Sequence, residues 1–214
     1  MIIIIIFIPN FLFSQTYLGV KGGGNFGWYS GEDWRNHINA AEQTVGVEVT
    51  DSVVPIENLG IFLDAMIIEH FGFSISININ AYGEDCIIGG NPYLRMEYRQ
   101  NVIEMPLLIK ITTSTNIHGG LYLIAGPIMQ YLFRDYEMKG TYFGETYSEE
   151  FLSSKNTFVF GLLGGIGFEI PSSNGLFKTD VTYGRNITRP SDTIVFPYGI
   201  INSIQFNIYY GSEL

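Results

Sequence analysis

The chain has 214 residues, a length that normally corresponds to one domain and that all-β barrels often reach undivided. It is 15% aromatic and only 15% charged, whereas a typical soluble domain is about 25% charged. Its net charge of −10, with lysines and arginines scattered, excludes nucleic acid as a partner because phosphate repulsion would stay uncompensated.

The first fourteen residues, MIIIIIFIPNFLFS, form an almost continuous apolar run. The run is too short to span a bilayer, for which about 20 residues are needed, but it suits the core of a signal peptide. We therefore predict a signal peptide at 1–14, although no Lys or Arg follows Met1, and an outer-membrane β-barrel domain at 15–214. The alternative is a buried N-terminal strand, but its isoleucine run would be an aggregation hazard.

After this run the dominant pattern is a period of two, which is typical of β-strands. The clearest example is FGFSISININAY, where phenylalanine and isoleucine alternate with small, uncharged serine and asparagine. A polar face of that kind suits a crowded interior better than a surface in contact with water. The same test predicts eight strands, at about 16–29, 58–68, 71–82, 101–113, 120–134, 157–170, 176–186 and 200–210.

The connections between these strands alternate in length. Three are short turns, whereas four are long, polar and rich in aromatic residues, at about 30–57, 83–98, 135–156 and 187–199. Each strand is long enough to cross a membrane when tilted, for which about 9–11 residues suffice. The pattern predicts an all-β, eight-stranded antiparallel up-and-down transmembrane β-barrel with short periplasmic turns and long extracellular loops, integral to the outer membrane of a Gram-negative cell.

Aromatic residues on the apolar face are expected to form girdles at the two membrane boundaries. The predicted outer girdle comprises Trp28, Tyr131, Phe133, Phe158, Phe160 and Tyr183. The predicted inner girdle comprises Phe71, Phe73, Phe168, Phe177, Phe206 and Tyr210.

Charged residues within the strands fall almost entirely on the opposite face. They predict a charge network in the lumen, formed by Lys21, Asp64, Glu104, Lys110, Glu169, Lys178 and Asp180. Such charges are expected to pair, because an unpaired buried ion is costly. An eight-stranded barrel has room for side chains but hardly for a water-filled pore, so we expect a plugged lumen and no porin activity.

Several segments resemble one family of membrane barrels. They are GVKGGGNFG near the predicted mature start, VIEMPLLIKI, LYLIAGPIMQYLF, GLLGGIGFEIP and DVTYGRNIT. In order and spacing they are similar to the PorT-like outer-membrane β-barrel family of Bacteroidota, over residues 15 to 210. The resemblance implies an eight-stranded exported barrel, and the namesake of the family is associated with type IX secretion and gliding. This chain departs at its C-terminus, which runs four residues beyond Tyr210 instead of ending on an aromatic residue.

Gly22, Gly24 and Gly27 formally match a dinucleotide-binding fingerprint. That motif needs a helix after its last glycine to hold the pyrophosphate, and WYSGEDW is a poor helix start. We instead expect glycines on the inward face to leave space for neighbours such as Tyr122.

Other candidate sites carry weak signals. Ser30, Asp33 and His37, with Asp51 and Ser52 further on, would suit a lipid-modifying enzyme at the outer leaflet, but their spacing has no specific pattern. His70 and His118 lie on neighbouring turns without a further metal ligand, and Cys86 alone can form no internal disulfide and is expected in a loop. We therefore predict no catalytic residue, no metal and no cofactor.

The function predicted from the sequence is a non-enzymatic structural or accessory subunit, linked to a secretion or assembly machine such as type IX secretion. Expected partners are outer-membrane lipid and lipopolysaccharide, and other outer-membrane or periplasmic proteins. The acidic residues of the long loops leave three interpretations open: solvated surface, divalent cations that bridge lipopolysaccharide, and contact with a partner protein. The alternatives are an outer-leaflet lipid-modifying enzyme and a soluble, lipocalin-like binding barrel, which would place its apolar faces inward.

Overall fold

A computed structural model describes most of the chain after the predicted signal peptide. The described residues are 15–45, 48–89, 94–115, 118–142, 145–152, 157–172, 175–188 and 200–214. The predicted signal peptide at 1–14 lies outside them.

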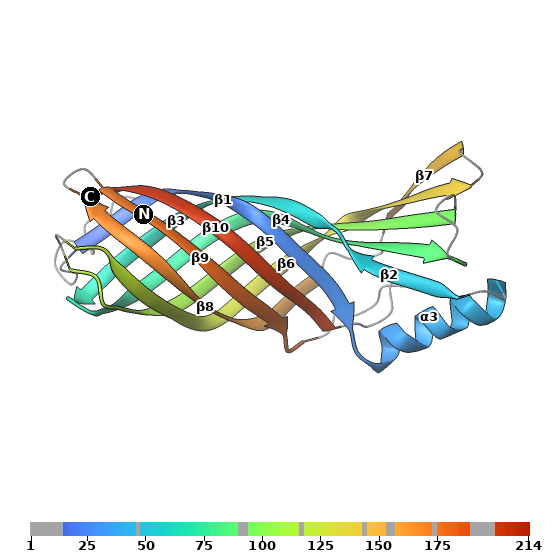
Figure 1. Cartoon of the computed structure of the whole chain (residues 1–214), viewed down its shortest axis with the longest axis horizontal. Helices are drawn as coiled ribbons and strands as arrows, with labels where there is room; N and C mark the ends of the chain where they lie inside the picture. Colours follow the sequence, from blue (N-terminus) through green and yellow to red (C-terminus); the bar gives the residue numbers. More distant parts are fainter. Residues whose placement is uncertain are drawn as a thin grey trace.

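Eight of the described strands close into one antiparallel barrel (Figure 1). They are β1 (Gln15–Ser30), β3 (Pro55–Ile68), β4 (Phe71–Ile88), β5 (Leu94–Thr112), β6 (Gly120–Tyr142), β8 (Thr157–Ser172), β9 (Gly175–Asn186) and β10 (Ile200–Glu213). Around the ring each pairs with its neighbours in chain order, and β1 pairs with β10 to close it. The predicted fold class is confirmed.

Alternation along the strands separates an apolar exterior from a polar interior. In β9 every second residue is buried from Leu176 to Asn186, and the residues between them are exposed. On the outer surface Val20 is 60% and Ile79 68% exposed, whereas Asp64 and Glu104 inside are fully buried. A soluble barrel has the opposite arrangement, so the lipocalin-like alternative is wrong. An inverted barrel of this kind is stable in a bilayer, and closed barrels of this type are outer-membrane proteins.

Short connections gather at one end of the barrel, where β1 begins and β10 ends (Figure 1). Residues 69–70 join β3 to β4, and a bridge between Thr115 and His118 narrows the turn between β5 and β6. By the rule for outer-membrane barrels this end faces the periplasm, as predicted.

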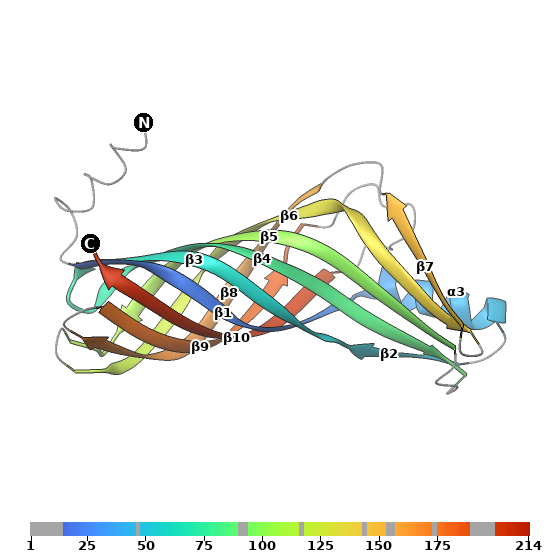
Figure 2. The same cartoon turned by 90° about the horizontal axis from the view of Figure 1, so that it is seen from above.

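At the other end the long connections contain more regular structure than the sequence indicated. The strands β4, β5 and β6 continue past the barrel, flanked by β2 (Val49–Val53) and β7 (Glu145–Leu152), while helix α3 (Glu32–Val45) follows β1 (Figures 1 and 2). Segments expected as loops are therefore largely strand, because each extended strand has a hydrogen-bonded neighbour on the adjacent hairpin. The connection at 187–199 lies almost wholly outside the described residues.

Helix α3 is the one helix in the described part of the chain. No described helix is both long enough and apolar enough to cross a bilayer.

Cys86 was expected in a loop, and this expectation is wrong. It lies in the extension of β4, is 2% exposed, and pairs with Asp51 of β2 on one side and Met96 of β5 on the other. The sheet pairing continues through it, so its surroundings are those of a packed strand.

Candidate functional site

The interior of the barrel holds all the charged side chains that the sequence assigned to it. Each is at most 5% exposed: Lys21, Asp64, Glu104, Lys110, Glu169, Lys178 and Asp180. Successive side chains of a strand point to opposite faces. Each of these residues lies an even number of positions from the other inward residues of its strand, so it also points inward. The strands therefore bring together charges that are up to 159 positions apart in the chain, as Lys21 and Asp180 show.

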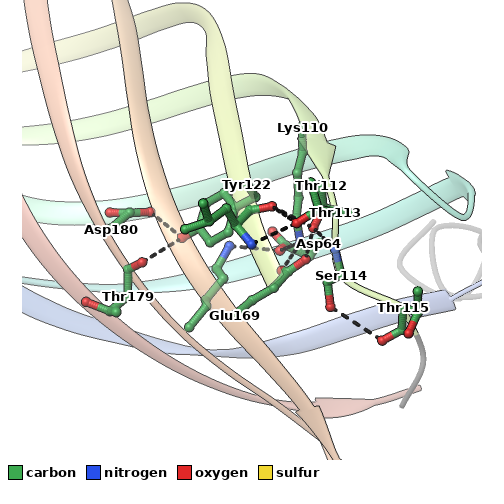
Figure 3. Close-up of polar contacts among 12 residues, drawn as sticks. Asp64, Lys110, Thr112, Thr113, Ser114, Thr115, Tyr122, Glu169, Thr179 and Asp180 are labelled. Atoms are coloured by element: carbon green, nitrogen blue, oxygen red, sulfur yellow. Dashed lines mark hydrogen bonds and ion pairs between the residues drawn. The ribbon is translucent and has the colours of Figure 1, made fainter. Parts of the chain in front are cut away.

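Asp64 on β3 is the centre of the ionic contacts near the periplasmic end (Figure 3). Its Oδ2 accepts hydrogen bonds from Lys110 Nζ at 3.0 Å and from Lys178 Nζ at 2.8 Å. Lys110 Nζ also donates to Glu169 Oε2 at 2.5 Å, and Thr112 Oγ1 donates to the other oxygen of Glu169 at 2.6 Å. The four charged groups form one chain that ties β3, β5, β8 and β9 together, and their charges cancel.

Aromatic rings complete the surroundings of Lys178. Its Nζ lies 4.3 Å from the ring centroid of Tyr209, 4.8 Å from that of Phe62 and 5.5 Å from that of Tyr122. A desolvated ammonium is attracted to such ring faces. The rings therefore replace part of the hydration that Lys178 loses on burial.

The other two inward carboxylates are held by neutral donors. Asp180 accepts from Tyr122 Oη at 2.8 Å and from Asn207 Nδ2 at 2.8 Å. Glu104 accepts from Gln130 Nε2 at 2.8 Å, from Gln205 Nε2 at 2.8 Å, from Asn80 Nδ2 at 3.2 Å and from the Tyr82 hydroxyl. The four donors to Glu104 come from three strands: Asn80 and Tyr82 from β4, Gln130 from β6 and Gln205 from β10.

Lys21 differs from the other two inward lysines. It is absent from the ion pairs seen among the described residues, and its Nζ lies 5.4 Å from the ring centroid of Tyr209. The expected direct pairing of Lys21 with one of the inward carboxylates is not seen in the described part of the chain.

Two apolar clusters inside the barrel were missed from the sequence. One is nearer the extracellular end and comprises Tyr82, Val102, Leu132, Val159 and Ile201. The other comprises Leu108, Tyr122, Ile124, Ile128 and Leu163. A signal existed, because LYLIAGPIMQYL in β6 is apolar on both faces, which is unusual for a strand with one polar side.

Inward glycines make room for the large rings that fill the lumen. A Cβ at Gly27 would overlap the ring of Tyr82, and one at Gly167 would overlap that of Tyr122. We expected the inward glycines of β1 to make room for Tyr122, but Gly27 makes room for Tyr82 instead. The expectation that an inward glycine leaves space for an aromatic ring is itself correct. Strand order decides this, because Gly167 on β8 pairs directly with Tyr122 on β6.

The aromatic residues assigned to the girdles lie on the outside of the barrel, partly buried or exposed. At the extracellular boundary Tyr131 contacts Phe158, with centroids 4.9 Å apart, and Trp28 contacts Tyr183 at 6.4 Å. Among those assigned to the periplasmic girdle, Phe206 lies in the middle of β10, where it pairs with Gly24.

Of the candidate catalytic residues Ser30, Asp33 and His37, the structure describes the side chain of Ser30. The Ser30 hydroxyl accepts from Asn202 Nδ2 at 2.7 Å and donates to the carbonyl of Ile200 at 3.4 Å. Asp33 and His37, expected in a loop, belong to helix α3. Within the described ranges no three His, Cys, Asp or Glu side chains gather as a metal site would require.

Comparison with known proteins yields structural similarities only. No protein family and no curated protein matches the sequence. Among solved structures, Ail of Yersinia pestis in complex with the heparin analogue sucrose octasulfate has a TM-score of 0.46 and 10% identity, covering 94% of this chain and 98% of Ail. OprG of Pseudomonas aeruginosa has a TM-score of 0.46 and 15% identity, and the match covers 94% of this chain and 97% of OprG. Neisserial surface protein A has a TM-score of 0.42 and 10% identity, and the match covers 93% of this chain and 97% of that protein. The chain is thus similar to small outer-membrane barrels, and its own strand pairing establishes the fold.

Proposed function

We propose that this chain is a non-enzymatic outer-membrane barrel with a closed lumen, which serves as a structural or accessory subunit of a secretion or assembly machine. The observation that carries the proposal is the filled interior, where ionic contacts, neutral hydrogen bonds and apolar clusters occupy successive levels of the barrel. Type IX secretion is the process that the PorT-like resemblance suggests, and it forms the finer part of the proposal.

The apolar cluster near the extracellular end supports closure of the lumen. Val102 and Val159 are fully buried, and Leu132 is 5% exposed. Water and ions gain no hydrogen bonds from such side chains, so this level opposes their passage. The ionic contacts on the periplasmic side add a second obstacle, because Asp64 and its lysines are tied across the lumen.

The strands that extend beyond the barrel support a role in contacts with other molecules. The order β2-β4-β5-β6-β7 forms a sheet that projects from the membrane, with α3 beside it (Figure 2). A surface of this size is unnecessary for a barrel that only fills the membrane. Because this sheet lies on the extracellular side, we propose other outer-membrane proteins as its partners and lipopolysaccharide as the surrounding lipid of the outer leaflet. Periplasmic partners would contact the opposite end, where the short turns lie.

Closure is tested by conductance in planar lipid bilayers. We expect the wild-type barrel to show no open-channel current. Replacement of the inward Leu132 and Val159 by glycine, combined with Asp64→Ala and Lys178→Ala so that both obstacles are removed, should produce current steps. The adjacent outward residues Phe133 and Phe158, replaced by alanine, are the matched controls and should leave the barrel silent. A steady wild-type current would refute the closed lumen.

The accessory role is tested by purification of tagged barrel from its native membrane in mild detergent. The expected result is a reproducible set of co-purifying membrane proteins that is lost when residues of β7 are deleted. A barrel that always purifies alone would refute this part of the proposal while leaving the closed membrane barrel intact.

A further inference from the structure

An apolar groove lies on the outer wall of the barrel, across β5, β6 and β8. Its volume is about 400 Å³, and it is lined by Ile109, Ile111, Leu123, Ile124, Ala125 and Gly165. The cause of the groove is a pair of small residues, because Ala125 on β6 pairs directly with Gly164 on β8. Around them the wall carries large side chains, with Ile109 opposite Ala125 on the other side.

The floor of the groove is also apolar. Ile124 belongs to the inner cluster that contains Leu108 and Leu163, so the wall is apolar on both faces at this point. Gly164 leaves real space, since a Cβ built there would meet its nearest neighbour, the carbonyl oxygen of Ile124, at 3.6 Å. The groove therefore offers dispersion contacts and no polar partner.

The position of the groove across the membrane restricts which molecules can occupy it. Ile109 and Ile111 lie just before the periplasmic end of β5 at Thr112, and Leu123 lies three residues after the start of β6. The groove thus runs through the periplasmic half of the apolar belt, where an aqueous ligand has no access. The molecules available at that depth are the acyl chains of the periplasmic leaflet and the walls of other membrane proteins.

The size of the groove favours an acyl chain over a second copy of the protein. A stable protein interface buries about 1,200–2,000 Å² in total. Six residues around a depression of about 400 Å³ cannot supply such an area, but they can surround one flexible chain. Between lipid and protein there is no hydrophobic gain, so an acyl chain in the groove would be held by dispersion contacts with its lining.

We propose that this groove binds one acyl chain of a glycerophospholipid from the periplasmic leaflet, with the chain lying between Ile109 and Leu123 and passing over Ala125. The binding site depends on the membrane position of the barrel but not on its closure or its partners. It holds one lipid more tightly than the rest of the apolar belt does.

The test fills the groove and counts retained lipid. Ala125→Leu places a side chain in the groove, and Gly24→Leu is the matched control, because Gly24 faces outward on β1 and has no atom within 4 Å of an added Cβ. Each barrel is purified in detergent containing dioleoylphosphatidylethanolamine, and native mass spectrometry measures the fraction that carries one lipid. A shift in mobility between unheated and heated samples on a denaturing gel verifies folding, and Ala125→Val serves if the leucine variant does not fold.

We expect the lipid-bound fraction to fall about fivefold in Ala125→Leu, the size of effect that one packing contact of roughly 1 kcal/mol gives, and to stay at the wild-type level in Gly24→Leu. Equal retention in all three proteins would overturn the proposal, and so would equal loss in both variants. A wild-type dimer that Ala125→Leu converts to a monomer would also overturn it, because the groove would then be an interface between copies. None of these results bears on conductance or co-purification, so the proposed function is tested separately.

Discussion

Replacement of Asp64 by asparagine removes the shared acceptor of two buried lysines while keeping the shape of the side chain. In the wild type, Asp64 Oδ2 lies 2.8 Å from Lys178 Nζ and 3.0 Å from Lys110 Nζ. Lys110 retains Glu169 at 2.5 Å, but Lys178 has Asp64 as the carboxylate in its described ion pairs. The substitution therefore leaves Lys178, which is fully buried, without a compensating charge.

The expected cost follows from that asymmetry. Breaking a buried pair by removal of one partner costs about 3–5 kcal/mol, because the remaining ion is buried uncompensated. Lys178→Met should cost less, about 1–3 kcal/mol, since Asp64 keeps its contact with Lys110. Asp64→Asn combined with Lys178→Met should recover much of the loss, which gives a favourable coupling energy in a double-mutant cycle.

Equilibrium urea unfolding in phospholipid vesicles, followed by tryptophan fluorescence, measures these free energies of unfolding. Glu57→Gln is the control, because Glu57 lies on the same strand as Asp64 and is exposed. If Asp64→Asn and Glu57→Gln reduce stability equally, or if Lys178→Met costs more than Asp64→Asn, the role assigned to Asp64 is refuted.

Three further substitutions test the interior. Glu104→Gln replaces a carboxylate that accepts four hydrogen bonds by an amide whose own N–H groups would face these donors. The free energy of unfolding in the same assay should fall by about 1–3 kcal/mol. An unchanged midpoint would contradict the donors assigned to Glu104. Gly27→Ala should destabilise the barrel by about 1–3 kcal/mol because the added Cβ overlaps the Tyr82 ring. Gly24→Ala should change stability little, because its Cβ meets nothing within 4 Å. A larger loss for Gly24→Ala than for Gly27→Ala would argue against the packing of Gly27 on Tyr82. Lys21→Met should be nearly neutral or stabilising, because no described ion pair is lost on removal of this buried charge, and a loss as large as that of Asp64→Asn would show that Lys21 pairs directly in the lumen.

Much of the fold is contained in local sequence patterns. Alternation with a period of two places Ile75, Ile77 and Ile79 outside and the residues between them inside, and the structure confirms this. Eight such segments joined by alternately short and long connections are sufficient to predict the barrel and its orientation. The pattern can be recognised in the sequence because one face of each membrane strand must be apolar toward lipid and the other must fit the crowded interior.

Local patterns predict poorly what happens beyond the membrane. Once a strand leaves the bilayer, neither face is required to be apolar, so the continuation of β4 and β6 and the strand β7 carry no strong periodic signal. Helix α3 likewise starts after Gly31 in a stretch that has the composition of a polar loop. In both cases pairing with neighbouring elements decides the structure.

The sequence by itself determined which side chains enter the lumen, because the side of a strand is fixed by counting in steps of two. Only the tertiary structure decided which of them meet. Asp64 contacts Lys110 and Lys178, and Gly27 admits Tyr82 rather than Tyr122, because barrel closure and strand register set the level of each residue along the axis. The register between the paired strands β6 and β8 likewise brings Ala125 beside Gly164 and opens the groove on the outer wall. These contacts join residues far apart in the chain, so local sequence cannot specify them.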